Sequence, residues 1–128
     1  MDVSIKFLGA AQSVTGSKYL LTINSKKILI DCGLFQGQKE LRLRNWDKLH
    51  VDPVEIDVVV ITHAHIDHVG YLPRLVKDGF RGKVICTNAT ESAPPPCAVC
   101  ALSFRTFHPI GSFPSLPPLR CFCSGRGL

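Results

Sequence analysis

The sequence contains no long apolar run. No stretch of its 128 residues reaches the roughly 18 apolar residues that a membrane-spanning helix needs. The N-terminus also lacks the basic region followed by an apolar region that defines a secretory signal. We therefore expect no membrane association and a cytoplasmic location.

Acidic residues are absent after Glu91. Residues 1–91 contain 12 Lys and Arg and all 10 acidic residues, which gives a nearly balanced net charge of +2. Residues 92–128 contain three arginines, seven of the nine prolines and four of the six cysteines. The overall charge of +5 therefore comes largely from this tail and is weak evidence for a nucleic-acid surface.

The tail also lacks any helical or strand periodicity, and its prolines interrupt regular elements. Such a segment cannot easily bury enough surface to offset its ordering entropy, so we expect residues 92–128 to be disordered. Its enrichment in Pro, Arg, Cys, Ser and Gly also suggests translation out of frame. The chain, of one-domain length, thus divides into a folded region at 1–91 and this tail.

The cysteines do not indicate a disulfide framework. Cys32 and Cys86 lie in strand-like contexts and are expected to be buried thiols. The four cysteines of the tail form two closely spaced pairs that could be interpreted as a four-thiolate zinc site. The second pair is too close for a zinc ribbon and the turns lack glycine, so we do not favour that site.

The most informative segment runs from His63 to His68, where three histidines and one aspartate fall within six residues. Imidazole and carboxylate are ligands of zinc and similar divalent metals. An apolar run at 56–61 predicts a buried strand before this segment, and Leu72 and Leu75 predict one face of a short helix after it. The segment therefore lies on a strand-to-helix loop, where α/β folds form sites.

The spacing of these residues favours two metal ions. His63 and His65 are two apart, so in extended backbone both rings project to one side and can bind one ion. Asp67 and His68 are adjacent and are better placed toward a second ion. Two ions about 3.5–4 Å apart commonly hydrolyse phosphate esters, one activating water and the other stabilising the attacked or leaving oxygen. The alternative is a solvated loop that happens to hold histidines.

Alternating apolar residues and turn residues predict the remaining elements. A hairpin predicted at 19–31 requires antiparallel strand pairs. The buried apolar run at 56–61 requires a covering helix layer, so we expect a mixed α/β fold. The predicted helix has Pro73 in its first turn and ends near Gly79. The predicted strands are 3–7, 19–23 and 27–31 joined by the turn Asn24-Ser25-Lys26, 56–62 and 83–87.

The histidine segment resembles the HxHxDH signature of the metallo-β-lactamase superfamily. Further likeness to its RNA-processing branch, the β-CASP group, covers segments 7–11, 14–21, 28–37 and 67–73. The resemblance ends near residue 91. It implies the N-terminal half of an αββα sandwich, two zinc ions, and a metal-dependent hydrolase that acts on RNA.

The resemblance also implies a role for each matching residue. His63 and His65 would bind the first zinc, and Asp67 and His68 the second, with Asp67 also orienting the attacking water. Asp31 matches an aspartate at the end of an early strand that fixes a ligand imidazole by a hydrogen bond, as ligating histidines generally require. The alternative for Asp31 is an ordinary turn residue.

The later ligands of the family have no counterparts in this sequence. His108 is the single histidine after the motif and its surroundings do not match, and no acidic residue follows Glu91. Two alternatives therefore stay open beside an RNA hydrolase. One is an inactive truncated fragment. The other is a superfamily hydrolase of a thioester or other small substrate, against which segments 14–19 and 34–37 argue.

A basic cluster surrounds the single tryptophan, Trp46. One interpretation is a phosphate-contacting surface beside the active site. The other is an ordinary solvated helix face with one packed tryptophan, which the acidic Glu40 and Asp47 favour by diluting the charge. The basic residues of this cluster are Lys39, Arg42, Arg44 and Lys48.

Overall fold

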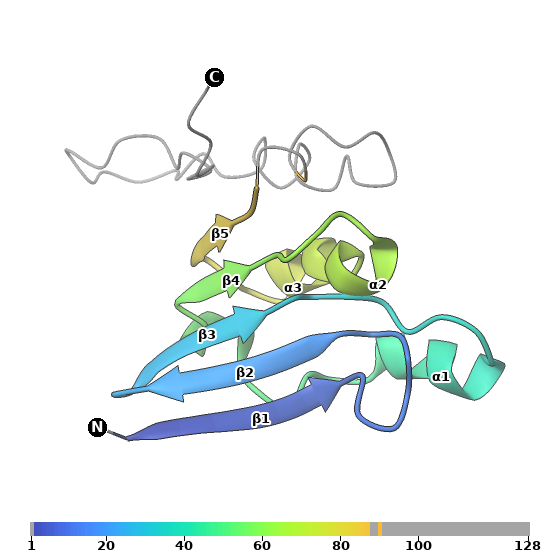
Figure 1. Ribbon diagram of the computed structural model, residues 1–128, viewed down its shortest axis with the longest axis horizontal. Coiled ribbons are helices and arrows are strands. Elements are labelled where there is room, and N and C mark those ends of the chain that lie inside the picture. The colour runs from blue at the N-terminus through green and yellow to red at the C-terminus, as the bar shows by residue number, and fades with distance from the viewer. Residues whose placement is uncertain (1, 88–89, 91–128) are drawn as a thin grey trace.

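The computed structural model describes residues 2–87 and residue 90. A five-stranded sheet has the order β1–β2–β3–β4–β5, with antiparallel pairing from β1 to β3 and parallel pairing from β3 to β5 (Figure 1). This mixed sheet confirms the predicted α/β class. The strands are β1 (Val3–Gly9), β2 (Lys18–Ile23), β3 (Lys26–Ile30), β4 (Val58–Val60) and β5 (Lys83–Ile85).

The hairpin between β2 and β3 is tighter than predicted. Asn24 and Ser25 both have positive φ, 46° and 70°, which is the backbone of a two-residue type I′ turn. Ile23 pairs with Lys26, so Lys26 belongs to β3 rather than to the turn. This register places the end of β3 beside the start of β2.

The helices are short and follow the strands at one end of the sheet. They are α1 (Lys39–Leu43), α2 (Ile66–Val69) and α3 (Leu72–Lys77), with 3₁₀ turns η1 (Arg44–Trp46) and η2 (Pro53–Glu55). Within the described residues, no helix is both long and apolar enough to cross a membrane.

The single helix predicted after the motif is wrong in two respects. It begins earlier, at Ile66, so Asp67 and His68 lie on a helix rather than on a loop. It is also broken after Gly70, the C-cap of α2. Pro73 explains the break, because it has no N–H to donate to the carbonyl group of Val69 and can stand only in the first turn of α3.

Two strands are shorter than predicted. β4 covers Val58–Val60 rather than 56–62, because the N–H of Ile56 donates to Pro53 in η2 and that of Asp57 donates to Lys27. β5 ends at Ile85, two residues before its predicted end. Ile56 is nevertheless buried, so the apolar run identified core residues even where it did not form strand.

The core lies between the sheet and the helices. Leu29 of β3 and Val59 of β4 pack with Leu72 and Leu75 of α3 and with Phe80, and all five side chains are fully buried. Cys32 and Cys86 are both buried, as predicted. The expected disorder of residues 92–128 concerns a segment outside the described residues.

Candidate metal centre

Asp31 stands at the centre of the site. It follows β3 directly, its φ is +58°, and its backbone N–H donates to the carbonyl oxygen of Val60 at 2.8 Å. The residue is 3% exposed, and its carboxylate accepts hydrogen bonds from the Thr62 N–H at 2.8 Å and from the hydroxyl groups of Thr62 and Ser17. The Nδ1 atom of His68 lies 2.7 Å from Asp31 Oδ2. This contact leaves Nε2 of His68 as the ring nitrogen that can face a metal.

The three motif histidines lie together. His63 Nε2 is 3.1 Å from His65 Nδ1, and the ring centroids of His63 and His68 are 4.0 Å apart. Thr62 Oγ1 lies 3.0 Å from His63 Nδ1, so the other ring nitrogen of His63, Nε2, is the one that faces His65. The rings of His63 and His65 thus lie together, as predicted, although the backbone bends at Ala64 instead of running extended between them.

The donor atoms converge in pairs rather than in larger groups. Among residues 2–87 and 90, no set of three or more His, Cys, Asp or Glu is arranged to hold one metal ion. One pair is His63 with His65, and the other is His68 Nε2 with Asp67 Oδ2, 3.5 Å apart. Two donors on one tetrahedral zinc lie roughly 3.3–3.6 Å apart, given bond lengths of about 2.0–2.2 Å. The Asp67–His68 separation lies within this range, whereas the His63–His65 pair is closer together and would have to open slightly to hold one ion.

Backbone hydrogen bonds fix the helix that carries Asp67 and His68. The N–H groups of Ser17, Cys32 and Leu34 donate to the carbonyl groups of Asp67, His68 and Ile66 at 2.9, 2.7 and 3.1 Å. These donors come from the loops before β2 and after β3. The segment before β2 therefore lies beside the motif.

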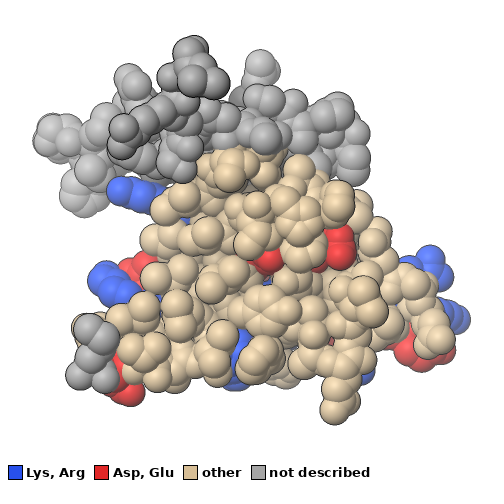
Figure 2. All heavy atoms as spheres, in the orientation of Figure 1, with Lys and Arg blue, Asp and Glu red and all other residues tan. Residues whose placement is uncertain are grey.

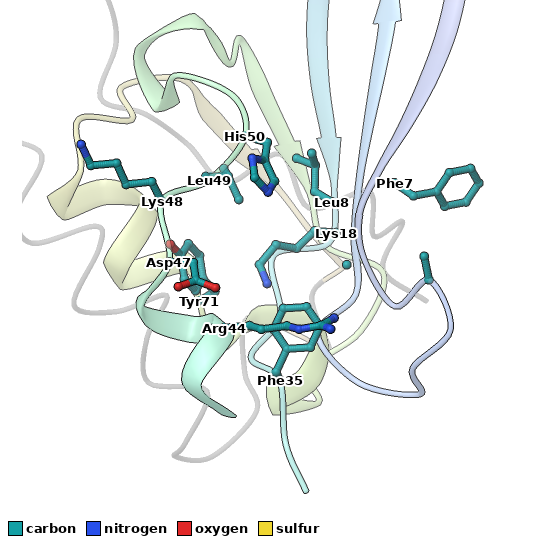
Figure 3. Close-up of a pocket in the computed structure, with 12 residues that line it drawn as sticks. Phe7, Leu8, Lys18, Phe35, Arg44, Asp47, Lys48, Leu49, His50 and Tyr71 are labelled. Carbon is teal, nitrogen blue, oxygen red and sulfur yellow. The ribbon is translucent and has the colours of Figure 1, made fainter. Parts of the chain in front are cut away.

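A separate cavity of about 320 Å³ contains Lys18, the first residue of β2 (Figure 3). None of the motif residues lines it. The side chain of Lys18 is 2% exposed, and its Nζ lies 4.6 Å from the ring centroid of Phe35 and 4.7 Å from that of Tyr71. Burial lowers the pKa of Lys18 to about 8, although the nearby Cys32 opposes this shift.

Sequence reasoning missed the parts played by Ser17, Thr62 and Lys18. Thr62 directly precedes the motif, which was a usable signal, whereas nothing in the sequence marks Ser17 as a partner of Asp31. Ser17 and Lys18 are adjacent in extended backbone, so their side chains point to opposite sides. Ser17 points toward Asp31 and Lys18 into the cavity. A lysine beside an apolar run carries no sequence signal for burial.

Comparison with known proteins agrees with this arrangement. The family model of the metallo-β-lactamase superfamily matches residues 14–117. A ribonuclease of Thermus thermophilus is 51% identical over 82 residues, which cover 64% of this chain and 19% of the ribonuclease. Cleavage and polyadenylation specificity factor 73 of Drosophila melanogaster is 38% identical over 91 residues, covering 70% of this chain and 13% of that protein.

Among solved structures, the chemotaxis sensor ODP in a peroxy diiron form has a TM-score of 0.50 at 18% identity. The match covers 77% of this chain and 39% of the sensor and shows the fold alone. The chain spans less than a fifth of the length of the two curated relatives above. The sequence relatives confirm the expected likeness to RNA-processing proteins. On the family match and the shared fold together, the chain belongs to the metallo-β-lactamase superfamily.

Proposed function

We propose that the chain carries part of the catalytic centre of a zinc-dependent RNA hydrolase. Membership of the superfamily implies binding of a divalent metal. The observation that carries the proposal is the pair of two-donor sets, His63 with His65 and Asp67 with His68. Imidazole nitrogen and carboxylate oxygen are zinc ligands, which makes zinc the metal of choice.

The proposed roles follow the contacts. Nε2 of His63 and Nδ1 of His65 would hold one zinc, and Oδ2 of Asp67 and Nε2 of His68 a second. Asp31 keeps the imidazole of His68 in place through Nδ1, which fixes the tautomer in which Nε2 is free to bind. Bound zinc would supply a Lewis acid and a water of lowered pKa. Asp67 would also orient the attacking water.

RNA is proposed as the substrate because the sequence relatives above are named as a ribonuclease and a cleavage and polyadenylation factor. We further propose that residues 1–91 are the metallo-β-lactamase unit of this chain and that residues 92–128 are a separate tail. The family match extends to residue 117, so the boundary is to be tested by limited proteolysis. A stable product that ends near residue 91 is expected.

Zinc affinity should be weak in the chain as it stands. Within the described residues each ion would have two protein donors, whereas a catalytic zinc normally has three and keeps one position for water. We therefore expect measurable zinc binding but little or no RNA cleavage by the purified chain.

Zinc titration calorimetry and a cleavage assay on labelled RNA test this proposal. His65→Ala should remove most zinc binding. Asp31→Asn should weaken it roughly 10- to 100-fold, because partners that orient metal ligands contribute that much to affinity. His50→Ala is the matched control, since His50 lines the Lys18 cavity rather than the motif, and it should bind zinc as the wild type does.

Unchanged zinc binding in His65→Ala would refute the assignment of the ligands. Efficient RNA cleavage by the wild-type chain that is lost in His65→Ala would show that two donors per ion are enough, and so would overturn the expected lack of activity. Cleavage that persists in His65→Ala would point to a contaminating nuclease or to a different centre.

A further inference from the structure

A second groove lies on the helical side of the molecule, beside α1 and η1. Its volume is about 600 Å³, and its lining includes Leu43, Trp46 and Arg74. Trp46 is 73% exposed and Leu43 55% exposed, so both apolar side chains face solvent at the groove. The packed tryptophan favoured from sequence is therefore wrong, and the large exposed ring calls for an explanation.

The charges that line this groove have one sign. Lys39, Arg42 and Arg74 contribute to its wall, and no Asp or Glu does. Arg74 is paired with Asp78 at 2.8 Å, but no ion pair within the described residues engages Lys39 or Arg42. Glu40, which dilutes the charge of this segment in the sequence, is not part of the lining. The groove therefore presents uncompensated positive charge beside an aromatic ring.

The tryptophan is held on a fixed segment. Asn45, its neighbour, accepts a hydrogen bond from the Phe35 N–H and donates one to the Phe35 carbonyl oxygen, both at 2.8 Å. These two bonds attach η1 to the loop after β3. The guanidinium group of Arg74 lies 5.9 Å from the ring centroid of Trp46 and contacts that ring. The ring is therefore held in position and still largely exposed.

The groove adjoins the candidate metal centre. Leu34 and Tyr71 line it, and the N–H of Leu34 donates to Ile66, the first residue of α2. In Figure 1, α1 and α2 lie at the same end of the sheet. A strand of nucleic acid that passed through the groove would thus run beside the helix that carries Asp67 and His68.

We propose that this groove binds single-stranded RNA, with a base stacked on Trp46 and the backbone phosphates on Lys39 and Arg42. Aromatic side chains stack on bases of any sequence, and basic side chains bind the phosphate backbone. The proposal rests on the proposed function in taking RNA as the ligand. RNA binding in this groove requires neither bound metal nor cleavage. The groove proposal and the proposed hydrolase function can therefore fail independently.

The single tryptophan of the chain makes the test direct. A short oligouridine RNA is titrated into the purified chain in the presence of a chelator, with Trp46 emission as the readout. Saturable quenching is expected. Anisotropy of a labelled oligouridine should show roughly tenfold weaker binding for Trp46→Ala, since stacking on one aromatic ring contributes about that much. Trp46→Phe, which keeps a ring, should lose less.

Matched charge variants separate this groove from general attraction to a basic chain. Arg42→Met should weaken binding several-fold and lower the slope of its salt dependence by about one. Lys83→Met removes the same charge from exposed β5 and should leave binding unchanged. His50→Ala should also bind RNA normally, because the groove does not contain that residue.

Three results would overturn the inference. One is RNA binding that leaves Trp46 emission unchanged. Another is equal weakening in Arg42→Met and Lys83→Met. The third is quenching of Trp46 emission by polyglutamate to the same extent as by oligouridine, since polyglutamate is negatively charged but has no bases. A thermal melt of each variant identifies any loss of folding, and quenching in the wild-type chain tests the proposal even if a variant unfolds.

Discussion

At the scale of single residues, the site depends on Asp31. Its positive φ is uncommon for a residue with a side chain, although aspartate tolerates this region better than most. The conformation turns the carboxylate toward Thr62, Ser17 and His68, which occupy three different segments of the chain. A sparsely populated backbone conformation retained next to candidate metal ligands is typical of functional sites.

Lys18 provides a prediction at this scale. The folded state depresses the pKa of Lys18 to about 8 from a normal value of 10.5. Between these values the unfolded chain binds more protons, so the contribution of Lys18 to the free energy of unfolding rises with pH. Lys18→Met removes the buried charge and keeps the apolar stem. At pH 7 it should be more stable than the wild type by about 1–3 kcal/mol.

Urea unfolding of both proteins between pH 7 and pH 10 checks this prediction. The difference in the free energy of unfolding between Lys18→Met and the wild type should narrow as pH rises above about 8. Burial raises the pKa of the Cys32 thiol to about 12. The contribution of Cys32 to the free energy of unfolding is therefore lost as pH rises from about 9 toward 12. Because both proteins contain Cys32, this loss largely cancels in the difference. A Lys18→Met protein clearly less stable than the wild type at pH 7 would contradict the argument.

At the scale of elements, backbone hydrogen bonds from outside the helix hold α2 in place. It has four residues, too few to be stable alone, and the N–H groups of three residues outside it donate to carbonyl groups of its residues. Gly33 makes the close approach possible, since a Cβ atom there would lie 1.5 Å from the carbonyl oxygen of Asp67. The position of Asp67 and His68 therefore depends on a glycine in the loop after β3.

Gly33→Ala should accordingly displace α2 or unfold the chain. We expect a loss of about 3 kcal/mol or more, because the collision is with backbone and cannot be relieved by a rotamer change. Gly37→Ala is the control: Gly37 has a positive φ, +93°, but a Cβ there meets nothing within 4 Å. Backbone strain alone should cost about 1 kcal/mol. Equal thermal destabilisation of the two variants would argue against the close approach.

At the scale of the whole molecule, the two faces of the sheet differ. Helices cover the face that carries Leu20, Leu29 and Val59. The pairing register places a second set of side chains on the other face, and nearly all of them are apolar. Figure 2 shows this face with few charged atoms over its centre; most of the Lys, Arg, Asp and Glu atoms lie toward the left and right edges of the view. This set includes Val3, Ile5, Phe7, Tyr19, Leu21, Ile28, Ile30, Val58 and Val60.

This apolar face should govern the behaviour of the chain in solution. Val3, Ile5 and Phe7 are 53%, 54% and 59% exposed, so the folded chain should bind the dye ANS and have limited solubility. Ile5→Lys should reduce dye binding and raise solubility, and should change stability by no more than about 1 kcal/mol. Ser4→Lys adds the same charge on the opposite face and is the control. Equal changes in dye binding and solubility in Ile5→Lys and Ser4→Lys would exclude this face as the cause of dye binding and low solubility.

The sequence by itself determined the class of fold, the hairpin, the buried thiols and the place of the motif after a buried strand. These features are local: alternation within a strand, turn residues between strands, and four ligand-type side chains within six residues. The resemblance implied that Asp31 fixes a ligand imidazole without saying which one, and in the structure its carboxylate lies beside His68. The metal-binding roles of these residues stay predictions.

Only the tertiary structure decided which residues surround the motif. Ser17 is near Asp31, and Gly33 near Asp67, because hydrogen bonds join the loops before β2 and after β3 to α2. Lys18 is buried and Trp46 exposed, the reverse of what their chemistry alone suggests. Burial depends on which distant segments pack together, and periodicity along the chain reports the direction of a side chain but not what it meets there.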